Sequence, residues 1–278
     1  GTDGGVFKST NGGENWSAVN SGLGNLNIWD LVIDPVTPAI IYAGTFGGGV
    51  FKSMNGGENW SAANNGLIDT HISCLRIDPV TPAILYVVTI PNGVFKSTNG
   101  GESWGEANAG LTGDNPAITR EIDPAMPSTL YLGTYANGVF KSTNGGGNWI
   151  VANTGIDLNT AYENSVDQLV IDPVESTTLY AVTRYKGIFI STNGGQNWIA
   201  FDTGLELVDA SHPILWINPI TPTTIYIGTF WGELFKSTDG GENWLLFNTG
   251  LGKYPIHALA VDPFMPTILY VGTYGGGV

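Results

Sequence analysis

The sequence is poor in cysteine. Cys74 is the only cysteine among 278 residues, so no disulfide within the chain can hold the fold together. It lies in an apolar stretch, where a small buried thiol is expected rather than a nucleophile. The fold must therefore depend on a hydrophobic core, and a compact chain of this length is long enough to bury a large one.

Positive charge is also scarce, because 10 Lys and Arg residues stand against 24 Asp and Glu residues and give a formal net charge of −14. A surface of this sign repels phosphate backbones and anionic lipid head groups, so no nucleic-acid partner is expected. No apolar run approaches the ~20 residues of a membrane-spanning helix, so no membrane insertion is expected either.

Glycine and aromatic side chains are abundant instead. The chain has 40 glycines, and 11% of its residues are aromatic. Disordered chains lack such aromatic content, and glycine is among the poorest helix formers. The composition therefore favours a folded, β-rich protein.

Six copies of one ten-residue segment divide the chain. Each copy begins with Phe and ends with Trp, and successive Phe positions are 44, 44, 45, 49 and 46 residues apart. The copies are FKSTNGGENW from Phe7, FKSMNGGENW from Phe51, FKSTNGGESW from Phe95, FKSTNGGGNW from Phe140, FISTNGGQNW from Phe189 and FKSTDGGENW from Phe235. Repeats of about this length are typical of propellers.

Each repeat predicts four short strands. The apolar run Leu31–Ile33 predicts an innermost strand buried on both sides, and Ile40–Thr45 predicts a β-branched and aromatic second strand. Gly49–Ser53 and Trp60–Asn64 follow as the third and fourth strands. Turn signals such as Asp-Pro and Asn-Gly-Gly separate them. Four strands per ~45 residues are the signature of a propeller blade.

The predicted fold class is all-β: a six-bladed β-propeller of four-stranded antiparallel blades, forming a single domain over residues 1–278. The blades are expected at about 25–66, 69–110, 115–155, 162–204, 210–250, and 254–278 together with 1–22. Pairing of the N- and C-terminal strands would close the ring and remove its exposed edges. A longer array is the alternative, because the chain stops where another Phe-Lys-Ser would follow.

The turn inside the repeated segment has clear physical roles. Asn11 can hydrogen-bond nearby backbone amides, the two following glycines can take positive φ, and Trp16 offers a flat face for packing. A structural role is therefore expected for the equivalent residues of all six copies. They are Asn11, Asn55, Asn99, Asn144, Asn193 and Asp239 in the turn, and Trp16, Trp60, Trp104, Trp149, Trp198 and Trp244 in the packing.

This pattern, Ser-x-Asn/Asp-Gly-Gly-x-x-Trp, resembles the Asp box of the sialidase-type (BNR) propellers. The whole repeat, in which segments such as IDPVTPAIIYAGT alternate with the boxes, is similar to the Vps10/sortilin propellers, the photosystem II assembly-factor propellers and the xyloglucan-hydrolysing enzymes. The resemblance covers the full chain and implies a propeller whose Asp boxes are structural and lie away from the ligand face. It does not choose a function, because one fold hosts many activities.

In those families the ligand face is formed by the loops between second and third strands and between successive blades. Five of the six such second-to-third-strand loops contain an aromatic residue here. These residues would suit stacking on sugar rings or burial against another subunit, and capping of the blade cores is the alternative. The candidate rim residues are Phe46, Tyr135, Tyr185, Phe230, Trp231 and Tyr274.

The arginines argue against a sialidase. That family implies three arginines converging on a carboxylate, but Arg76, Arg120 and Arg184 are the only arginines present. The first two would point to opposite sides of their strands, and the third lies in a loop. Arg76 is in register with Glu121 of the next blade, so an ion pair is expected there.

Asp30 and Asp167 are weak catalytic candidates near the start of two innermost strands, where a carboxylate pair could flank a sugar at ~5–9 Å. Solvated channel residues are the alternative. His71, His212 and His257 also precede innermost strands, but no His-x-His or His-x-x-x-His spacing supports a metal site. Nucleotide-binding and Ser-His-Asp motifs are missing too, so no metal and no cofactor are expected.

These observations favour a non-catalytic extracellular or cell-envelope propeller that serves as a scaffold for binding or for structural self-assembly. Its expected partner is a polysaccharide or a protein, including further copies of the chain in a homo-oligomer or filament. Two alternatives stay open. One is a carbohydrate-active, glycoside hydrolase-like propeller or a fragment of one, using Asp30 or Asp167, and the other is an assembly factor that holds a segment of another protein.

Overall fold

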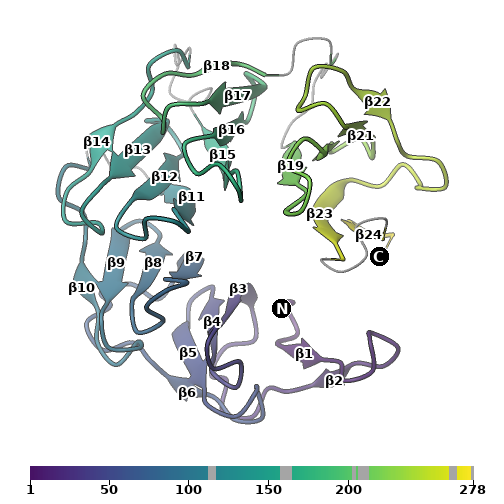
Figure 1. Ribbon diagram of the computed structural model, residues 1–278. Coiled ribbons are helices and arrows are strands. Elements are labelled where there is room, and N and C mark those ends of the chain that lie inside the picture. Colours follow the sequence, from purple (N-terminus) through teal and green to yellow (C-terminus); the bar gives the residue numbers. More distant parts are fainter. Residues whose placement is uncertain (112–116, 157–164, 202–204, 206–212, 263–267, 277–278) are drawn as a thin grey trace. The chain divides into compact units, whose positions relative to one another are not determined.

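The computed structural model describes residues 1–111, 117–156, 165–201, 205, 213–262 and 268–276 (Figure 1). The regular elements of these residues are all β-strands, β1 to β24, and no helix among them is long and apolar enough to cross a membrane. The chain divides into two compact units. The first comprises Gly1–Leu130 with Ser142–Ile150, and the second comprises Tyr131–Lys141 with Val151–Val278.

The first unit contains two complete four-stranded antiparallel sheets, in which the strands follow one another in chain order. One sheet consists of β3 (Ile28–Ile33), β4 (Ile41–Thr45), β5 (Gly49–Ser53) and β6 (Ser61–Ala62). The other consists of β7 (Ile72–Ile77), β8 (Leu85–Thr89), β9 (Gly93–Ser97) and β10 (Gly105–Glu106). A two-stranded sheet is formed by β1 (Phe7–Lys8) and β2 (Ser17–Ala18).

The second unit repeats the same architecture. One sheet consists of β15 (Val166–Ile171), β16 (Leu179–Thr183), β17 (Ile188–Ser191) and β18 (Ile199–Ala200). The next consists of β19 (Ile214–Ile217), β20 (Ile225–Gly228), β21 (Leu234–Ser237) and β22 (Leu245–Leu246). A two-stranded sheet is formed by β23 (Ile256–Val261) and β24 (Leu269–Thr273).

A further four-stranded sheet supplies residues to both units. Its strands are β11 (Ala117–Ile122), β12 (Leu130–Thr134), β13 (Val139–Ser142) and β14 (Ile150–Val151). The antiparallel all-β class and the four-stranded sheets are therefore confirmed. The blade count of six, the single domain and the closure by the terminal strands remain predictions, because β1–β2 and β23–β24 are separate sheets in different units.

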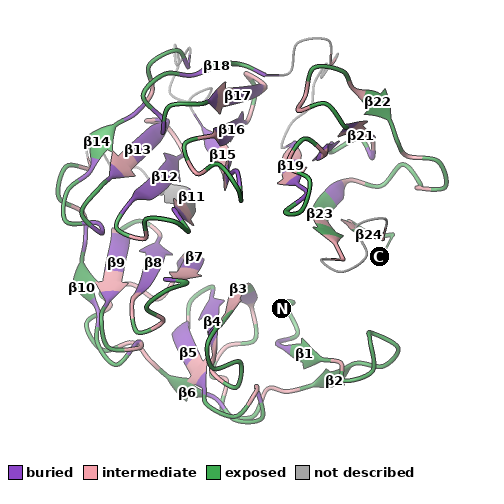
Figure 2. Ribbon diagram, viewed as in Figure 1, coloured by how far each residue is buried: buried purple, intermediate pink, exposed green. Residues whose placement is uncertain are grey.

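In the four-stranded sheets the second strand is more deeply buried than the innermost one. Every residue of β8 is buried, and Figure 2 shows this strand in purple, whereas β10 at the outer edge of the same sheet is exposed and green. The expectation for Leu31–Ile33 was wrong, because Ile33 is 56% exposed and its two predecessors are only half-buried. The innermost strand has a strand partner on one side only, whereas the second strand lies between two.

The fourth strand is shorter than the expected Trp60–Asn64. The strand itself covers Ser61–Ala62, and Ala63 N also donates to Val50 O of β5 at 2.8 Å, whereas the backbone N–H of Trp60 donates to Ser21 O of the preceding connection at 2.8 Å. The fourth strand therefore ties its own sheet to the previous segment of chain.

Hydrophobic clusters form where successive sheets of one unit face each other. In the first unit Tyr42 of β4 shares a cluster with Leu75 of β7. In the second unit Tyr180 of β16 shares a cluster with Leu215 of β19. Each sheet thus buries its apolar residues against the next repeat, as expected for an array in which one repeat cannot bury its core alone.

Candidate ligand-binding rim

The loop after a second strand is held by a buried threonine. Thr45 Oγ1 donates to Gly49 O at 2.8 Å and accepts from Gly48 N at 3.0 Å, so the turn closes around the hydroxyl. The residue directly after the threonine therefore begins the loop outside the core, and Phe46 is 39% exposed there. We call these loops, with the residues that contact them, the rim.

Three rings gather on the rim of the first unit. Phe46 stacks on Trp29 of β3 with ring centroids 4.7 Å apart and an interplanar angle of 20°. The ring of His71 meets Phe46 edge-on, also at 4.7 Å. Trp29 is 50% exposed and is therefore accessible to solvent. We call Trp29, Phe46 and His71 the aromatic platform.

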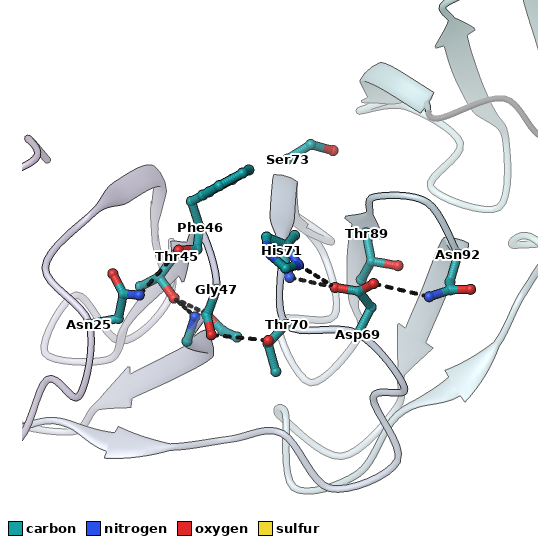
Figure 3. Close-up of polar contacts among 12 residues, drawn as sticks. Asn25, Thr45, Phe46, Gly47, Asp69, Thr70, His71, Ser73, Thr89 and Asn92 are labelled. Atoms are coloured by element: carbon teal, nitrogen blue, oxygen red, sulfur yellow. Dashed lines mark hydrogen bonds and ion pairs between the residues drawn. The ribbon is translucent and has the colours of Figure 1, made fainter.

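Polar contacts fix the loop that carries Phe46 (Figure 3). Asn25 Nδ2 donates to Phe46 O at 3.1 Å, and Gly47 N donates to Thr70 O at 3.0 Å. The hydroxyl of Thr70 donates in return to Gly47 O at 3.0 Å. The position of the Phe46 ring is therefore set by both flanking connections of the chain.

The imidazole of His71 is held by Asp69. The Nδ1 atom lies 2.9 Å from Asp69 Oδ1, which also accepts the backbone N–H of His71 at 2.8 Å, and Figure 3 shows both contacts. Asn92 Nδ2 donates to the other carboxylate oxygen at 3.1 Å. Burial acts to raise the pKa of Asp69, but the hydrogen bonds from His71 and Thr70 outweigh it and lower the pKa. The His71 side chain remains 44% exposed.

A pocket lies on the rim of the second unit, where the β20–β21 loop meets the connection into β23. Its volume is about 480 Å³, and Gly232, Glu233, Asn248, Lys253 and Pro255 line it together with two predicted rim residues, Phe230 and Trp231. These two rings stand at 85° with centroids 5.6 Å apart, and they are 40% and 56% exposed. The pocket thus combines an aromatic corner with one acidic and one basic side chain.

Tyr135, another predicted rim residue, lies beside an arginine. The guanidinium carbon of Arg184 is 5.2 Å from the centre of the Tyr135 ring. The same guanidinium donates to both carboxylate oxygens of Asp167, at 3.0 and 3.1 Å, and Ser165 Oγ donates to this carboxylate at 2.5 Å. The catalytic candidate Asp167 is therefore the anchor of an arginine on the rim.

The last two predicted rim residues are strongly exposed. Tyr185 follows Arg184 and is 62% exposed. Tyr274 is 73% exposed, and its ring lies 5.7 Å from that of His257. Capping of the blade cores, the alternative expectation for such residues, does not describe these two tyrosines.

The other catalytic candidate, Asp30, joins two sheets. Its carboxylate accepts from Leu75 N of β7 at 2.8 Å and from the guanidinium of Arg76 at 3.0 Å. Arg76 also reaches Glu121 at 3.4 Å, which confirms the predicted ion pair. Gln168 makes the corresponding contact in the second unit, because it donates to Leu215 O and accepts from Leu215 N.

A neutral amide can thus serve at the position of Asp30. Asp30 and Asp167 belong to different units, and each is bound to an arginine of its own unit.

The Asp-box residues hold their own turns. In the first box Asn11 Oδ1 accepts from Asn15 N at 3.0 Å and from the hydroxyl of Ser9, which also accepts from Gly13 N. The sixth box uses a carboxylate, and hydrogen bonds from Asn243 and Ser237 lower the pKa of Asp239 to about 2. The equivalent acceptors in the remaining boxes are Asn55, Asn99, Asn144 and Asn193.

The box tryptophans fall into three groups. Those of the four middle boxes are buried, and each donates Nε1–H to a carbonyl of the preceding sheet: Trp60, Trp104, Trp149 and Trp198. Trp244 is half-buried, and its Nε1 has no partner among the described residues. Trp16 is 63% exposed.

Sequence reasoning missed Trp29 and Asp69. Trp29 occupies the second position of an innermost strand, where other repeats have Ser73, Asp167 or His257. This variation at one position, within a repeat whose other positions are nearly constant, could have indicated a functional residue. His71 and His257 lie on the rim, whereas His212 lies outside the described residues. No cluster of three or more His, Cys, Asp or Glu side chains in the described part of the chain could hold a metal ion.

No protein-family model and no curated protein matches the chain. Among solved structures, it is similar to an ancestral GH74 enzyme with a TM-score of 0.78 and 22% identity, over 92% of this chain and 35% of that chain. For a GH74 enzyme from Niastella koreensis the TM-score is 0.66 and the identity 21%, over 89% and 41% of the two chains. For YCF48 from Cyanidioschyzon merolae they are 0.64 and 16%, over 90% and 80%.

The chain therefore spans less than half the length of either GH74 enzyme and most of YCF48. At these identities a likeness shows the fold and does not extend to activity. With the repeated four-stranded antiparallel sheets, it shows that the chain has a β-propeller fold.

Proposed function

We propose that the chain is a non-catalytic binding propeller that holds a polysaccharide against the aromatic platform of its rim. The observation that carries this proposal is the platform itself, in which Trp29 and Phe46 are stacked, partly exposed and fixed by the surrounding loops. Flat aromatic faces suit the apolar faces of sugar rings. Because the loop is already held in place, binding costs little ordering entropy.

The polar groups beside the platform suit a ligand rich in hydroxyls. His71 is partly exposed, and Asp69 and Asn92 adjoin it. Such groups can exchange hydrogen bonds with sugar hydroxyls at the edge of a stacked ring. Two of the similar structures are GH74 enzymes, which are glycoside hydrolases, and this favours a polysaccharide among the possible partner classes.

The surroundings of the two candidate carboxylates support a role without catalysis. In a glycoside hydrolase both carboxylates must be able to reach the sugar. Asp30 and Asp167 are instead each held in place by an arginine, Arg76 and Arg184 respectively.

Affinity electrophoresis in gels that contain xyloglucan, xylan or mixed-linkage β-glucan tests the proposal. We expect at least one polysaccharide to retard the protein, and Trp29→Ala to weaken that binding by ~10-fold or more, as for a buried aromatic contact. Leu245→Ala is the matched control, because Leu245 is 74% exposed on β22 and does not belong to the rim.

No retardation by any of the three polysaccharides, or retardation that Trp29→Ala leaves unchanged, contradicts the proposal. The same samples can be assayed for released reducing ends, which we do not expect. Hydrolysis that Asp30→Asn abolishes would establish the glycoside hydrolase alternative instead.

A second candidate, a protein partner, is favoured by the pocket of the second unit. Glu233 and Lys253 flank the corner formed by Phe230 and Trp231, and this mixture of charge and aromatic surface suits a short peptide segment. Trp231→Ala separates the two candidates, because it should weaken a peptide complex while leaving retardation by polysaccharide intact.

A further inference from the structure

Two successive repeats of the first unit make the same turn before their innermost strands. Asn25 Oδ1 accepts from Asn27 N before β3, and Asp69 Oδ1 accepts from His71 N before β7, both at 2.8 Å. The carbonyl of His71 then accepts from Ile90 N at 3.0 Å, and the carbonyl of Asn27 accepts from the corresponding loop in the same way. The turn therefore forms with an amide at both positions, and it requires neither the carboxylate of Asp69 nor the imidazole of His71.

The second of these turns has an additional contact, which fixes the hydrogen atoms of the imidazole. His71 Nδ1 lies 2.9 Å from Asp69 Oδ1. Although burial acts to raise the pKa of Asp69, the hydrogen bonds that it accepts lower the pKa, so the carboxylate is ionised at neutral pH and can only accept. Nδ1 must therefore donate. A neutral imidazole has one donor and one acceptor nitrogen, so Nε2 is the acceptor.

Asp69 is itself held on its other side. Asn92 Nδ2 donates to Asp69 Oδ2 at 3.1 Å, so both oxygens of this carboxylate are engaged. Among the described side chains that contact the imidazole, Asp69 is charged and Phe46 is not. The direction in which Nε2 of His71 points is thus set by the protein before a ligand binds.

The space beside Nε2 is left open by a glycine. A Cβ atom added to Gly47 would lie 3.9 Å from His71 Nε2. Nε2 makes no hydrogen bond within the part of the chain that the structure describes, and the His71 side chain is 44% exposed. Figure 3 shows the imidazole between Phe46 and Asp69. An acceptor of fixed direction is therefore available at the edge of the aromatic platform.

We propose that Nε2 of His71 accepts a hydrogen bond from a hydroxyl group of the polysaccharide on the aromatic platform, so that the site favours sugars in which this hydroxyl is free over sugars in which it is substituted. The inference rests on the proposed function and names the class of polysaccharide that the platform selects. A free hydroxyl can turn its hydrogen towards Nε2. A methyl ether or an acetyl ester has no hydrogen to donate and leaves the acceptor unpaired.

The selection is expected to be moderate in size. A site that buries its acceptor completely can reject a ligand without the donor by several orders of magnitude. The His71 side chain is 44% exposed, so water can take the place of the lost donor. The net value of one hydrogen bond then corresponds to a ~3- to 10-fold difference in affinity.

Affinity electrophoresis at pH 8, where histidine is ordinarily neutral, compares xyloglucan, xylan and mixed-linkage β-glucan with their O-methylated forms. We expect methylation to weaken retardation of the wild-type protein ~3- to 10-fold more than that of His71→Asn. This variant reproduces the turn of Asn25 and Asn27, but its side chain is too short to reach the position of Nε2. His71→Gln should restore part of the difference, because its amide oxygen reaches further. Leu245→Ala should behave as the wild-type protein does.

The direction of the imidazole can be measured without a ligand. The nitrogen NMR resonances of His71, assigned by their loss in His71→Asn, should show a protonated Nδ1 and an unprotonated Nε2 at pH 8. The opposite tautomer overturns the inference and leaves the platform in place.

The binding experiment separates this inference from the proposed function. Retardation that Trp29→Ala weakens, but that methylation reduces equally in the wild-type protein and in His71→Asn, overturns the inference alone. No retardation by any of the polysaccharides contradicts the proposed function and the inference with it.

Discussion

The Asp-box turns and the rim loops of the same sheets differ in how constant their contacts are from one repeat to the next. We call the Asp-box turns, with the residues that contact them, the box edge. At the box edge one residue type makes one contact in every repeat. The box serine hydroxyl, for example, accepts from the N–H of the second box glycine in all six copies. At the rim, the residue after the threonine is Phe, Ile, Tyr or Arg, and the partners that it meets differ from one sheet to another. The pairs are Phe46 with Trp29, Arg184 with Asp167, and Tyr274 with His257.

This difference distinguishes the residues that the fold requires from the residues that the fold does not require. A turn with two glycines at positive φ admits few residue types, so the box repeats. The rim positions sit on a turn that the threonine already closes, and they are free to hold a stack, an ion pair or an isolated ring. Variety at the rim therefore needs a reason other than folding, and ligand binding supplies one.

The contacts at the box edge are different where the sheet β15–β18 meets the sixth box. Ile190 stands where the other five repeats have a lysine, and Phe201 stands where the first four repeats have alanine or valine and the sixth has Phe247. Phe201 packs edge-on against Trp244 at 5.9 Å, and the indole N–H has no acceptor in the described part of the chain. An aromatic contact thus stands where the four middle boxes receive a lysine hydrogen bond and donate a tryptophan hydrogen bond, as in Lys52–Gly100 and Trp104–Ala63.

The largest expected effect is at the box edge. Trp104 is 6% exposed and donates to Ala63 O, so Trp104→Ala removes a large buried ring and a hydrogen bond between sheets. We expect a loss of ~3–5 kcal/mol in the free energy of unfolding, measured by urea denaturation. Tyr274→Ala, at a rim residue that is 73% exposed, should cost no more than ~0.5 kcal/mol. Equal losses of unfolding free energy for the two variants would contradict the distinction between the box edge and the rim.

An intermediate effect is expected for Asp30, whose contacts lie between the sheets. Asp30→Asn leaves Arg76 with one carboxylate instead of two and weakens the acceptor for Leu75 N. A loss of ~1–3 kcal/mol in unfolding free energy follows from a charged hydrogen bond removed at a half-buried site. The control is Asp3→Asn, because Asp3 is exposed in the N-terminal turn. An unchanged free energy of unfolding would mean that Asp30 does not stabilise the fold, and Asp30 would again be a candidate for a catalytic role.

The same comparison explains what the sequence could predict. The box hydrogen bonds join residues two to four positions apart, so the repeated motif alone predicted the acceptor role of Asn11. The Arg76–Glu121 ion pair was also within reach, since equal spacing from an Asp-Pro turn places equivalent residues of successive sheets side by side. Both predictions use local geometry or the repeat period and nothing else.

The rim was predictable only in outline. The sequence showed that Phe46 and Trp231 lie in loops, but not that Phe46 stacks on Trp29, because that contact depends on strand register, including the irregularity between Ile28 and Asp30. Asp30 looked like a channel carboxylate because its acceptor role towards Leu75 is made across two sheets. A contact between sheets that occurs in one repeat and not in the others cannot be predicted from the repeat period.

The smallest expected effect concerns an ordered polar contact at the rim. Hydrogen bonds from His71 and Thr70 lower the pKa of Asp69 below its ordinary value of 3.8. A depressed folded-state pKa means that the ionised carboxylate stabilises the fold above the unfolded pKa, and that this contribution is lost as the pH falls through the folded pKa. Because the contact lies near solvent, we expect Asp69→Asn to lower the melting temperature by only ~1–2 °C at pH 6.

That difference should shrink as the pH falls through the lowered folded-state pKa of Asp69, below which both proteins carry a neutral side chain at position 69. Thermal unfolding of the two proteins from neutral pH down to strongly acidic pH measures it, and Asp3→Asn should show no such trend. A difference that grew on acidification would mean that the pKa of Asp69 is raised, and that burial rather than hydrogen bonding dominates at the rim. A loss of stability as large as that expected for Trp104→Ala would mean that Asp69 is required for folding. His71 would then belong to the structural part of the molecule rather than to the ligand-binding surface.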